Sequence, residues 1–288
     1  MADLLDRASR LIQSEGFTGA HSFIFLTRYA ALQDDKALLR LVGETLEELS
    51  TLPESATLAY AYAEYYEASR SGFCPAAAEF LLARASRNDP MLLSALAKSA
   101  RVFGSAALLE RAIDLAEEEQ EEEREDPFTA LGLLELYRAT QHGDYLNRAS
   151  DLAARIRRDF QQKFDPSSVY DLEQPSANSA VALLYDALGR ITQEEQWVKA
   201  REVQNRFIAL LADRYPTKVA FGLCALLSDS FEAKTVVCVV PEGTVPPEVK
   251  ALLSFYSPLT EILVVPGQTD RTKVYLLRQG KLEEIAGI

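Results

Sequence analysis

Few residues of this 288-residue chain combine the type and position that proton transfer requires. It has two histidines, His21 and His142. His142 lies in a short polar segment, QHGD, and is expected to be a surface turn residue. His21 follows a glycine-containing segment and is the candidate for a catalytic or ligand-binding role. An epimerase places an acid and a base on opposite sides of a sugar carbon, usually two histidines with pKa values near the working pH. A two-histidine epimerase is therefore not expected.

A second group of candidates lies at the start of segment 170–192, YDLEQPSANSAVALLYDALGRIT. Asp171 and Glu173 are carboxylates of the kind a glycosidase holds across a cleft. Neighbours on one short segment seldom face each other across a substrate, so helix capping and loop hydrogen bonding are their alternative roles. Ser176 is expected to cap a helix whose free amide groups bind a carboxylate, a phosphate or a sugar hydroxyl. The candidate ligand-binding residues are Gln174, Ser176, Asn178 and, from an earlier helix, Arg28.

The remaining reactive residue types give no further site. Cys74, Cys224 and Cys238 are far apart and form no CxxC pair, which indicates neither a metal site nor a disulfide and suits a reducing cytoplasm. The acidic run 117–126 is expected to be a solvated helix end. No glycine-rich phosphate loop is present, so no cofactor is expected, and the cysteines and histidines give no support for a metal. Four tyrosines at helical spacing, which are expected in the core and alternatively as a sugar-stacking surface, are Tyr60, Tyr62, Tyr65 and Tyr66.

The overall charge excludes some partners. The chain has 43 acidic and 30 basic residues, a net charge of -13, which disfavours nucleic acid and an anionic membrane. Its first residues interleave charges among leucines, unlike a signal peptide, and no later apolar run is long enough to cross a bilayer. We therefore expect a cytoplasmic protein with neither nucleic acid nor membrane as partner.

The elements that must position these residues are helices from residue 3 to about 231. Apolar helices ending in LTRYAA, YYEA, LYRA and LYDA are each followed by a polar turn and a second helix. The repeat of roughly 35 to 50 residues is typical of helical hairpins. A closed ring of hairpins, the α/α toroid, accommodates the variable period and long inner loops. We therefore predict a mainly α toroid over residues 1–232, with an open solenoid as the alternative.

The pattern changes near residue 233. The unbroken β-branched run TVVCVV at 235–240 predicts a buried strand, and Pro246-Pro247 begins a short helix. A second strand at 261–265 and a hairpin around Gln279-Gly280 follow. Residues 233–288 are thus predicted to form a small β-α-β plus hairpin unit, too small to bury much by itself and packed on the helices.

Short motifs extend this prediction. The chain has GFTGA at 16–20 followed by FLTRYA at 25–30, QPSANS at 174–179, and the α/β ending at 235–285. These resemble GGFGGAPKFP with LLRYA, E-P-S-G-N-S and the short α/β ending of the DUF255 family. That family comprises thioredoxin-domain proteins and includes the spermatogenesis-associated protein 20 group. The resemblance implies a fold similar to N-acylglucosamine 2-epimerase and the six-hairpin glycosidases.

The resemblance also bears on function. The thioredoxin-fold domain with its CxxC, which precedes the toroid in that family, has no counterpart here. The resemblance therefore implies a diverged, shortened member, non-catalytic and binding a small polar ligand or a protein partner, such as a separate thioredoxin-like protein. The alternative is a carbohydrate-active isomerase or hydrolase that uses the bowl of the toroid, with His21, Asp171 and Glu173 as catalytic residues.

Overall fold

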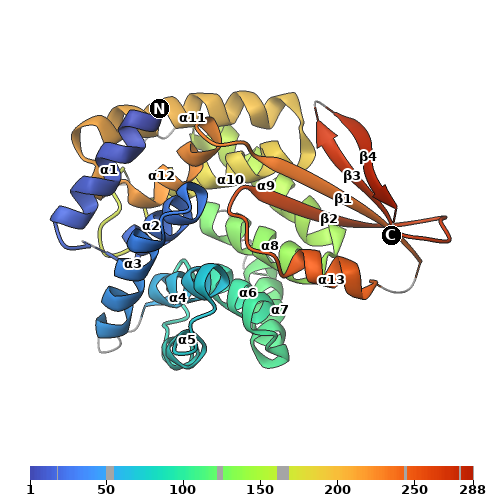
Figure 1. Cartoon of the computed structure of the whole chain (residues 1–288), viewed down its shortest axis with the longest axis horizontal. Coiled ribbons are helices and arrows are strands. Elements are labelled where there is room, and N and C mark those ends of the chain that lie inside the picture. The colour runs from blue at the N-terminus through green and yellow to red at the C-terminus, as the bar shows by residue number, and fades with distance from the viewer. Residues whose placement is uncertain are drawn as a thin grey trace.

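The computed structural model describes residues 1–17, 19–49, 55–121, 126–160, 169–242, 245–278 and 280–287. Within these ranges, six helices form an inner ring: α2 (Ala20–Gln33), α4 (Ala56–Ser69), α6 (Leu92–Phe103), α8 (Pro127–Thr140), α10 (Ala177–Thr192) and α12 (Ala220–Leu226). Each inner helix packs against the next, and α12 packs against α2 (Figure 1). The ring is therefore closed, as the predicted α/α toroid requires, and the open solenoid is wrong.

An outer layer surrounds the ring. Its helices are α1 (Ala2–Ser14), α3 (Lys36–Glu48), α5 (Cys74–Leu82), α7 (Ala106–Glu121), α9 (Gly143–Phe160) and α11 (Glu195–Arg214). Five of them follow an inner helix in the chain and pack against it, from α3 on α2 to α11 on α10, while α1 packs against α11. Figure 1 shows this succession of helix pairs beside the strands. None of the described helices is long and apolar enough to cross a membrane.

The hydrophobic pattern decides which helix lies inside. Inner helix α4 is buried from Ala56 to Tyr65, so both of its faces need apolar or small residues. Outer helix α3 buries the single stripe Leu38, Val42 and Leu46, at the i, i+4, i+8 spacing of an amphipathic helix. Two layers of helices result, because a helix that is apolar all round has to be enclosed by others.

The inner helices end in the same way. The residue after α2, α4, α6, α8 and α10 is in the left-handed conformation, with φ between 52° and 69°. These residues are Asp34, Arg70, Gly104, Gln141 and Gln193. A left-handed residue stops a helix and turns the chain sharply back, which gives the short connections from inner to outer helices. Four of these five residues are not glycine, and for each of them the left-handed conformation costs about 1 kcal/mol.

The C-terminal residues form a mixed sheet, as predicted. The strands are β1 (Lys234–Pro241), β2 (Thr260–Gly267), β3 (Lys273–Arg278) and β4 (Lys281–Gly287), in the order β2-β1-β3-β4. β1 is parallel to β2, and α13 (Pro247–Leu253) connects them. β3 is antiparallel to both β1 and β4. The sheet and α13 enclose a second, smaller apolar core around Cys238, Val249 and Val264.

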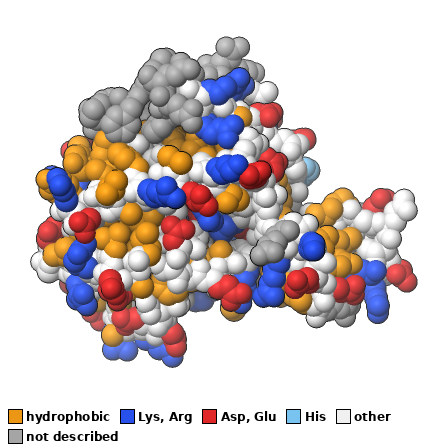
Figure 2. All heavy atoms as spheres, turned by 90° about the horizontal axis from the view of Figure 1, so that it is seen from above, with side chains coloured by type: hydrophobic (Ala, Val, Ile, Leu, Met, Phe, Trp, Pro, Cys, Tyr) orange, Lys and Arg blue, Asp and Glu red, His pale blue; other side chains and the backbone are white. Residues whose placement is uncertain are grey.

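The α/β unit is seated on the ends of the inner helices that carry the left-handed residues. Gln141 Oε1 accepts a hydrogen bond from Val264 N at 3.0 Å. Gln193 donates to Leu277 O at 3.3 Å and accepts from Gly280 N at 2.8 Å. Figure 2 shows this unit as a lobe that projects from the helical body. The same residues that end the inner helices therefore hold the sheet.

Some predicted boundaries need correction. The helical pattern that was predicted to extend to about residue 231 ends in the short α12, flanked by the 3-10 turns η3 (Pro216–Lys218) and η4 (Leu227–Asp229). The reason is local, because the backbone at Val219, with φ -137° and ψ 26°, is not helical. The predictions that fall on Thr18 in the 16–20 motif, on residues 122–125 of the acidic run and on Gln279 lie outside the described residues.

Candidate functional site

A cavity of about 110 Å³ lies inside the ring, between the C-terminal halves of the inner helices and the loop from α13 to β2. We call it the ring chamber. Ten charged side chains line it: Arg28, Glu64, Glu67, Lys98, Arg101, Glu135, Arg138, Asp186, Arg190 and Glu261. Nine of them come from five successive inner helices and one from β2. Glu261 comes from the lobe that covers the ring.

The charges follow the repeat of the fold. They sit one helical turn apart on α4 (Glu64 and Glu67), on α6 (Lys98 and Arg101) and on α8 (Glu135 and Arg138). Residues three apart on a helix lie on one face, so each pair faces the centre of the ring. Acidic α4 thus stands next to basic α6, whereas α8 and α10 each carry one acidic and one basic chamber residue.

Ion pairs join these helices across the ring. Lys98 Nζ lies 3.0 Å from Glu64 Oε2 and 2.9 Å from Glu67 Oε2. Arg28 binds Glu64 through two nitrogens, at 3.0 and 2.9 Å. Arg101 contacts Glu67 at 2.6 Å and 3.2 Å. Since these carboxylates are buried, their partners have to replace the water they lose.

The α/β unit completes the set of pairs through β2 and the loop before it. Glu261 receives two hydrogen bonds from Arg138, at 3.1 and 2.6 Å, and lies 2.9 Å from Arg190 Nη1. Tyr256 donates from its hydroxyl to Glu64 Oε1 at 2.7 Å. The α/β unit is therefore an electrostatic part of the chamber as well as its cover.

The pairing keeps these groups charged. Burial alone would raise the pKa of Glu67, but the charges of Lys98 and Arg101 lower it to about 2. Glu261 is lowered to a pKa of about 2 in the same way, against burial, by Arg138 and Arg190. Burial opposes the charge of Lys98, yet Glu64 and Glu67 raise its pKa. These groups therefore hold fixed charges across the neutral pH range.

Four polar atoms on residues that line the chamber make no hydrogen bond: Glu135 Oε2, Arg101 Nε, Arg190 Nη1 and Ser94 Oγ. Glu135 Oε1 accepts from the Tyr60 hydroxyl at 2.9 Å and from Arg138 at 2.8 Å, while its buried Oε2 has no partner. Arg101 uses both terminal nitrogens on Glu67 and leaves Nε free. These atoms are themselves closed off from solvent, so they are unsatisfied polar groups within the chamber wall.

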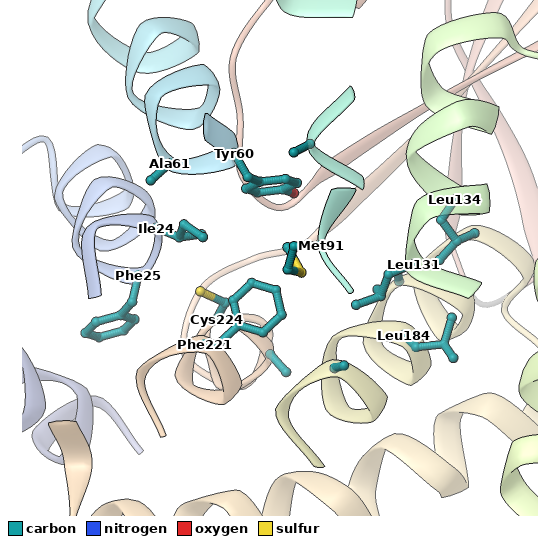
Figure 3. Close-up of a cluster of buried hydrophobic side chains, with 14 of the residues drawn as sticks. Ile24, Phe25, Tyr60, Ala61, Met91, Leu131, Leu134, Leu184, Phe221 and Cys224 are labelled. Carbon is teal, nitrogen blue, oxygen red and sulfur yellow. The ribbon is translucent and has the colours of Figure 1, made fainter. Parts of the chain in front are cut away.

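The floor of the chamber is apolar. Met91, Leu131, Phe221 and Cys224 are all buried and line it from below. Figure 3 shows these side chains from different inner helices meeting at the middle of the ring, with Tyr60 beside them. The centre of the toroid is therefore filled toward the N-terminal ends of the inner helices, and the polar space is confined to the other end.

The predicted catalytic histidine lies away from the chamber. His21 is in the first turn of α2 and Arg28 is seven residues later, about 10 Å along the helix axis. His21 is 1% exposed and its Nδ1 has no hydrogen-bond partner. Burial lowers its pKa below the ordinary 6.5, with partial compensation by the charge of Asp171. His21 is thus held neutral next to a carboxylate, while Arg28 belongs to the chamber.

Asp171 acts on the backbone of the ring. Its Oδ1 accepts from Ser176 N at 2.7 Å and its Oδ2 from Phe221 N at 2.8 Å. It thereby links the start of α10 to the start of α12. Ser176 caps α10 as predicted, since its side chain accepts from Ser179 N at 3.1 Å. These contacts match the capping alternative for Asp171.

The other residues predicted in this segment point elsewhere. Glu173 and Gln174 are exposed, and Asn178 is buried, where its carbonyl and side-chain oxygens accept from Gln204 Nε2 at 3.1 and 3.3 Å. The structure thus brings His21, Asp171 and Ser176 toward the N-terminal ends of the inner helices and separates them from Arg28. Among the described residues, no group of three or more His, Cys, Asp or Glu side chains is placed to hold a metal ion.

Most chamber residues were missed in the sequence. Charged residues on helices are usually solvated, so Glu64, Lys98 and Glu135 carried no individual signal. The available signal was positional, because the charges recur at the ends of the same repeated motifs that revealed the hairpins. LTRYAA contains Arg28, and LYRA contains Arg138.

Comparisons with known proteins bear on the fold. No protein-family model and no curated protein sequence matches the chain. A crystal structure of the Lin0763 protein from Listeria innocua is similar, with a TM-score of 0.54 and 11% sequence identity. The match covers 73% of this chain and 85% of that chain. At this identity the likeness supports the fold alone.

Proposed function

We propose that this protein is a non-catalytic binding protein that holds a small polar ligand in the ring chamber. The observation that carries the proposal is the chamber itself, a cavity of about 110 Å³ lined by ten charged side chains, all from the ring and its cover. Binding sites for small molecules combine a concave space with a few placed polar groups. Here the polar groups are the charged side chains of the chamber wall.

The fixed charges favour binding over catalysis. A general acid or base works best when its pKa lies near the operating pH. Glu67 and Glu261, with pKa values of about 2, are far below that range, and Lys98 is raised above its ordinary 10.5. Groups of this kind orient a ligand and do not exchange protons with it at neutral pH.

The carbohydrate-active alternative receives less support. It requires two acid/base groups that reach one ligand position from different sides. Asp171 spends both carboxylate oxygens on backbone amides, and Glu173 is exposed on the loop. His21 is the remaining candidate, and it lies in the first turn of α2, away from the chamber.

A binding screen tests the proposal. The full chain is screened by thermal unfolding and ligand-observed NMR against amino acids, sugars, sugar acids and polyols, each also followed for turnover. The same screen is run on Ala187→Leu, because Ala187 is buried on the chamber wall and the larger side chain fills the cavity. We expect at least one compound that binds the unaltered chain and not the variant, without turnover. Turnover of a sugar would favour the alternative, and binding unchanged by Ala187→Leu would place the site elsewhere.

The relation to the DUF255 family belongs to this proposal. It is supported by the motifs at 16–30 and 174–179 and by the order of the two parts, a toroid followed by a small α/β unit. Sequences of intermediate divergence test it. They should align QPSANS with E-P-S-G-N-S at the start of the α10 helix, and a failure of that alignment would remove the relation.

A further inference from the structure

Two hollows adjoin each other at the cover of the ring. Beside the ring chamber, a second hollow of about 570 Å³ lies between the C-terminal ends of α2 and α4, the start of α3 and the segment that follows α13. Three residues line both hollows: Glu67, Phe255 and Tyr256. The second hollow reaches the surface, because its lining includes the exposed Asp34 and Lys36. The shared side chains therefore stand between the chamber and a hollow that is open to solvent.

Residues 254–258, between α13 and β2, cover the chamber at this point, and we call them the strap (Figure 1). In the described part of the chain, two hydrogen bonds tie the strap to the ring. The Tyr256 hydroxyl donates to Glu64 Oε1 at 2.7 Å, and Arg70 donates to the carbonyl oxygen of Ser254 at 2.6 Å. The bond from Arg70 is exposed, so the bond from Tyr256 is the one that lies inside the ring.

The two sides of the strap are anchored unequally. On one side, Leu259 is buried in the core of the helices, and its carbonyl oxygen accepts from Lys234 N at 2.9 Å. On the other side, α13 buries only Val249, and the side chain of Phe255 is 71% exposed. Segments with few buried apolar contacts are those that open locally while the rest of a protein stays folded. The strap therefore has a firm end at Leu259 and a weakly held end at α13.

We propose that the strap is a gate to the ring chamber, which the hydrogen bond from Tyr256 to Glu64 holds closed and which opens toward the second hollow. A hydrogen bond to a carboxylate is stronger than one between neutral groups, so this single contact can hold a weakly anchored segment. When it breaks, Glu64 keeps Arg28 and Lys98 as partners, so the ion pairs of the ring survive the opening. The gate goes beyond the proposed function, because it concerns access to the chamber whatever the chamber binds.

Three buried cysteines report where the full chain opens. Cys224 lines the chamber, Cys238 lies in the core of the α/β unit, and Cys74 begins α5 in the helical body. Burial raises the pKa of Cys224 and of Cys74 to about 12. Since the thiolate is the reactive form, these thiols react only when an opening brings them into contact with water. The protein is treated at mildly alkaline pH with methyl methanethiosulfonate, and the initial labelling rate of each cysteine is measured by mass spectrometry.

Three variants test the gate. Tyr256→Phe removes the hydroxyl and keeps the ring, so it should raise the labelling rate of Cys224 at least about fivefold and leave Cys238 and Cys74 unchanged. Arg70→Ala removes the exposed bond to Ser254, where water competes, and should raise the Cys224 rate by less. Tyr275→Phe, on β3 of the same α/β unit, is the matched control and should change none of the three rates.

The three labelling rates also show what would overturn the gate. A Cys224 rate that Tyr256→Phe does not change would mean that this hydrogen bond does not hold the chamber closed. Equal acceleration of Cys224 and Cys238 would mean that the whole α/β unit lifts from the ring, and equal acceleration of all three would mean general unfolding. Either result contradicts an opening limited to the strap. Because no ligand is used, the gate can fail while the binding function stands, and the ligand screen can fail while the gate stands.

Discussion

The centre of the inner ring is filled by apolar side chains at one end and by paired charged side chains at the other. Toward the N-terminal ends, Met91 and Phe221 fill the centre with apolar contacts, and Asp171 binds backbone amides. Toward the C-terminal ends, the centre is occupied by charged side chains that pair with each other and with Glu261 of the α/β unit. The contacts named at the first end all come from the helical part of the chain.

This difference shows where the ring depends on its cover. We call the apolar, N-terminal end of the ring the closed end and the opposite end the charged end. Apolar side chains at the closed end need only packing contacts, whereas the buried charges need partners of opposite sign at short range. Some of those partners lie in the α/β unit, so the charged end is complete only when that unit is in place. We expect the two ends to respond differently to substitution and to pH.

The largest effect is expected from Glu261→Gln. The variant leaves Arg138 and Arg190 buried with less compensating charge, and breaking a buried pair on one side typically costs about 3–5 kcal/mol. The free energy of unfolding is measured by urea denaturation. Glu232→Gln is the matched control, because the Glu232 side chain is 66% exposed in its pair with Lys234, and it should cost less than about 1 kcal/mol. Equal effects would mean that Glu261 is not needed at the charged end.

Acid should weaken the charged end next. Glu67 and Glu261 have folded pKa values of about 2, below their ordinary 4.5, so their contribution is fully present above about pH 4.5. It is lost as the pH falls toward 2, by at most about 1.4 kcal/mol per pH unit for each group. Urea unfolding at several pH values measures this slope. Glu67→Gln should make it shallower, and a flat profile from pH 4.5 to 2.5 would contradict the assignment.

The closed end is tested by Asp171→Asn. The amide replaces one acceptor oxygen with a donor, so either Ser176 N or Phe221 N loses its buried partner, at about 1–3 kcal/mol. Thermal and urea unfolding measure the loss, with Glu173→Gln as a control on the same loop that should change stability by less than about 0.5 kcal/mol. An Asp171→Asn protein as stable as the unaltered chain would remove the capping role.

The smallest effect on stability is expected at Gln141, where two variants separate the loss of the hydrogen bond to the sheet from the relief of backbone strain. Gln141 has φ 59° and holds Val264 N, so Gln141→Ala loses the hydrogen bond and keeps the strained conformation. Gln141→Gly loses the same bond but relieves the strain, which is worth about 1 kcal/mol. We expect the alanine variant to be less stable than the glycine variant by about that amount. Hydrogen exchange at Val264 should accelerate in both, and unchanged exchange would show that the bond does not hold the strand.

Much of the architecture could be predicted from sequence because it depends on local patterns. The 3.6-residue periodicity revealed the helices, the repeated helix endings revealed the hairpins, and the β-branched run at 235–240 revealed the first strand. Ser176 was identified as a cap for the same reason, since a cap acts within one turn of its own position.

The chamber could not be predicted in this way. Its pairs join residues far apart in the chain, such as Arg138 with Glu261, and Tyr256 with Glu64. A charged residue in a helix is far more often solvated than buried, so each one alone argues for the surface. The shortening of the last inner helix escaped notice because Val219 is apolar and gives no sign of its non-helical backbone.

The α/β unit is held on the helix ends mainly through its main chain, which affects how freely its side chains can be exchanged. Gln141 and Gln193 bind main-chain atoms of Val264, Leu277 and Gly280, and Arg70 binds the carbonyl oxygen of Ser254. These groups are present whatever side chain the strand or loop carries. The outward-facing positions of the lobe are therefore free to drift in sequence, while a change of Gln141, Gln193 or Glu261 removes a contact between the ring and the lobe.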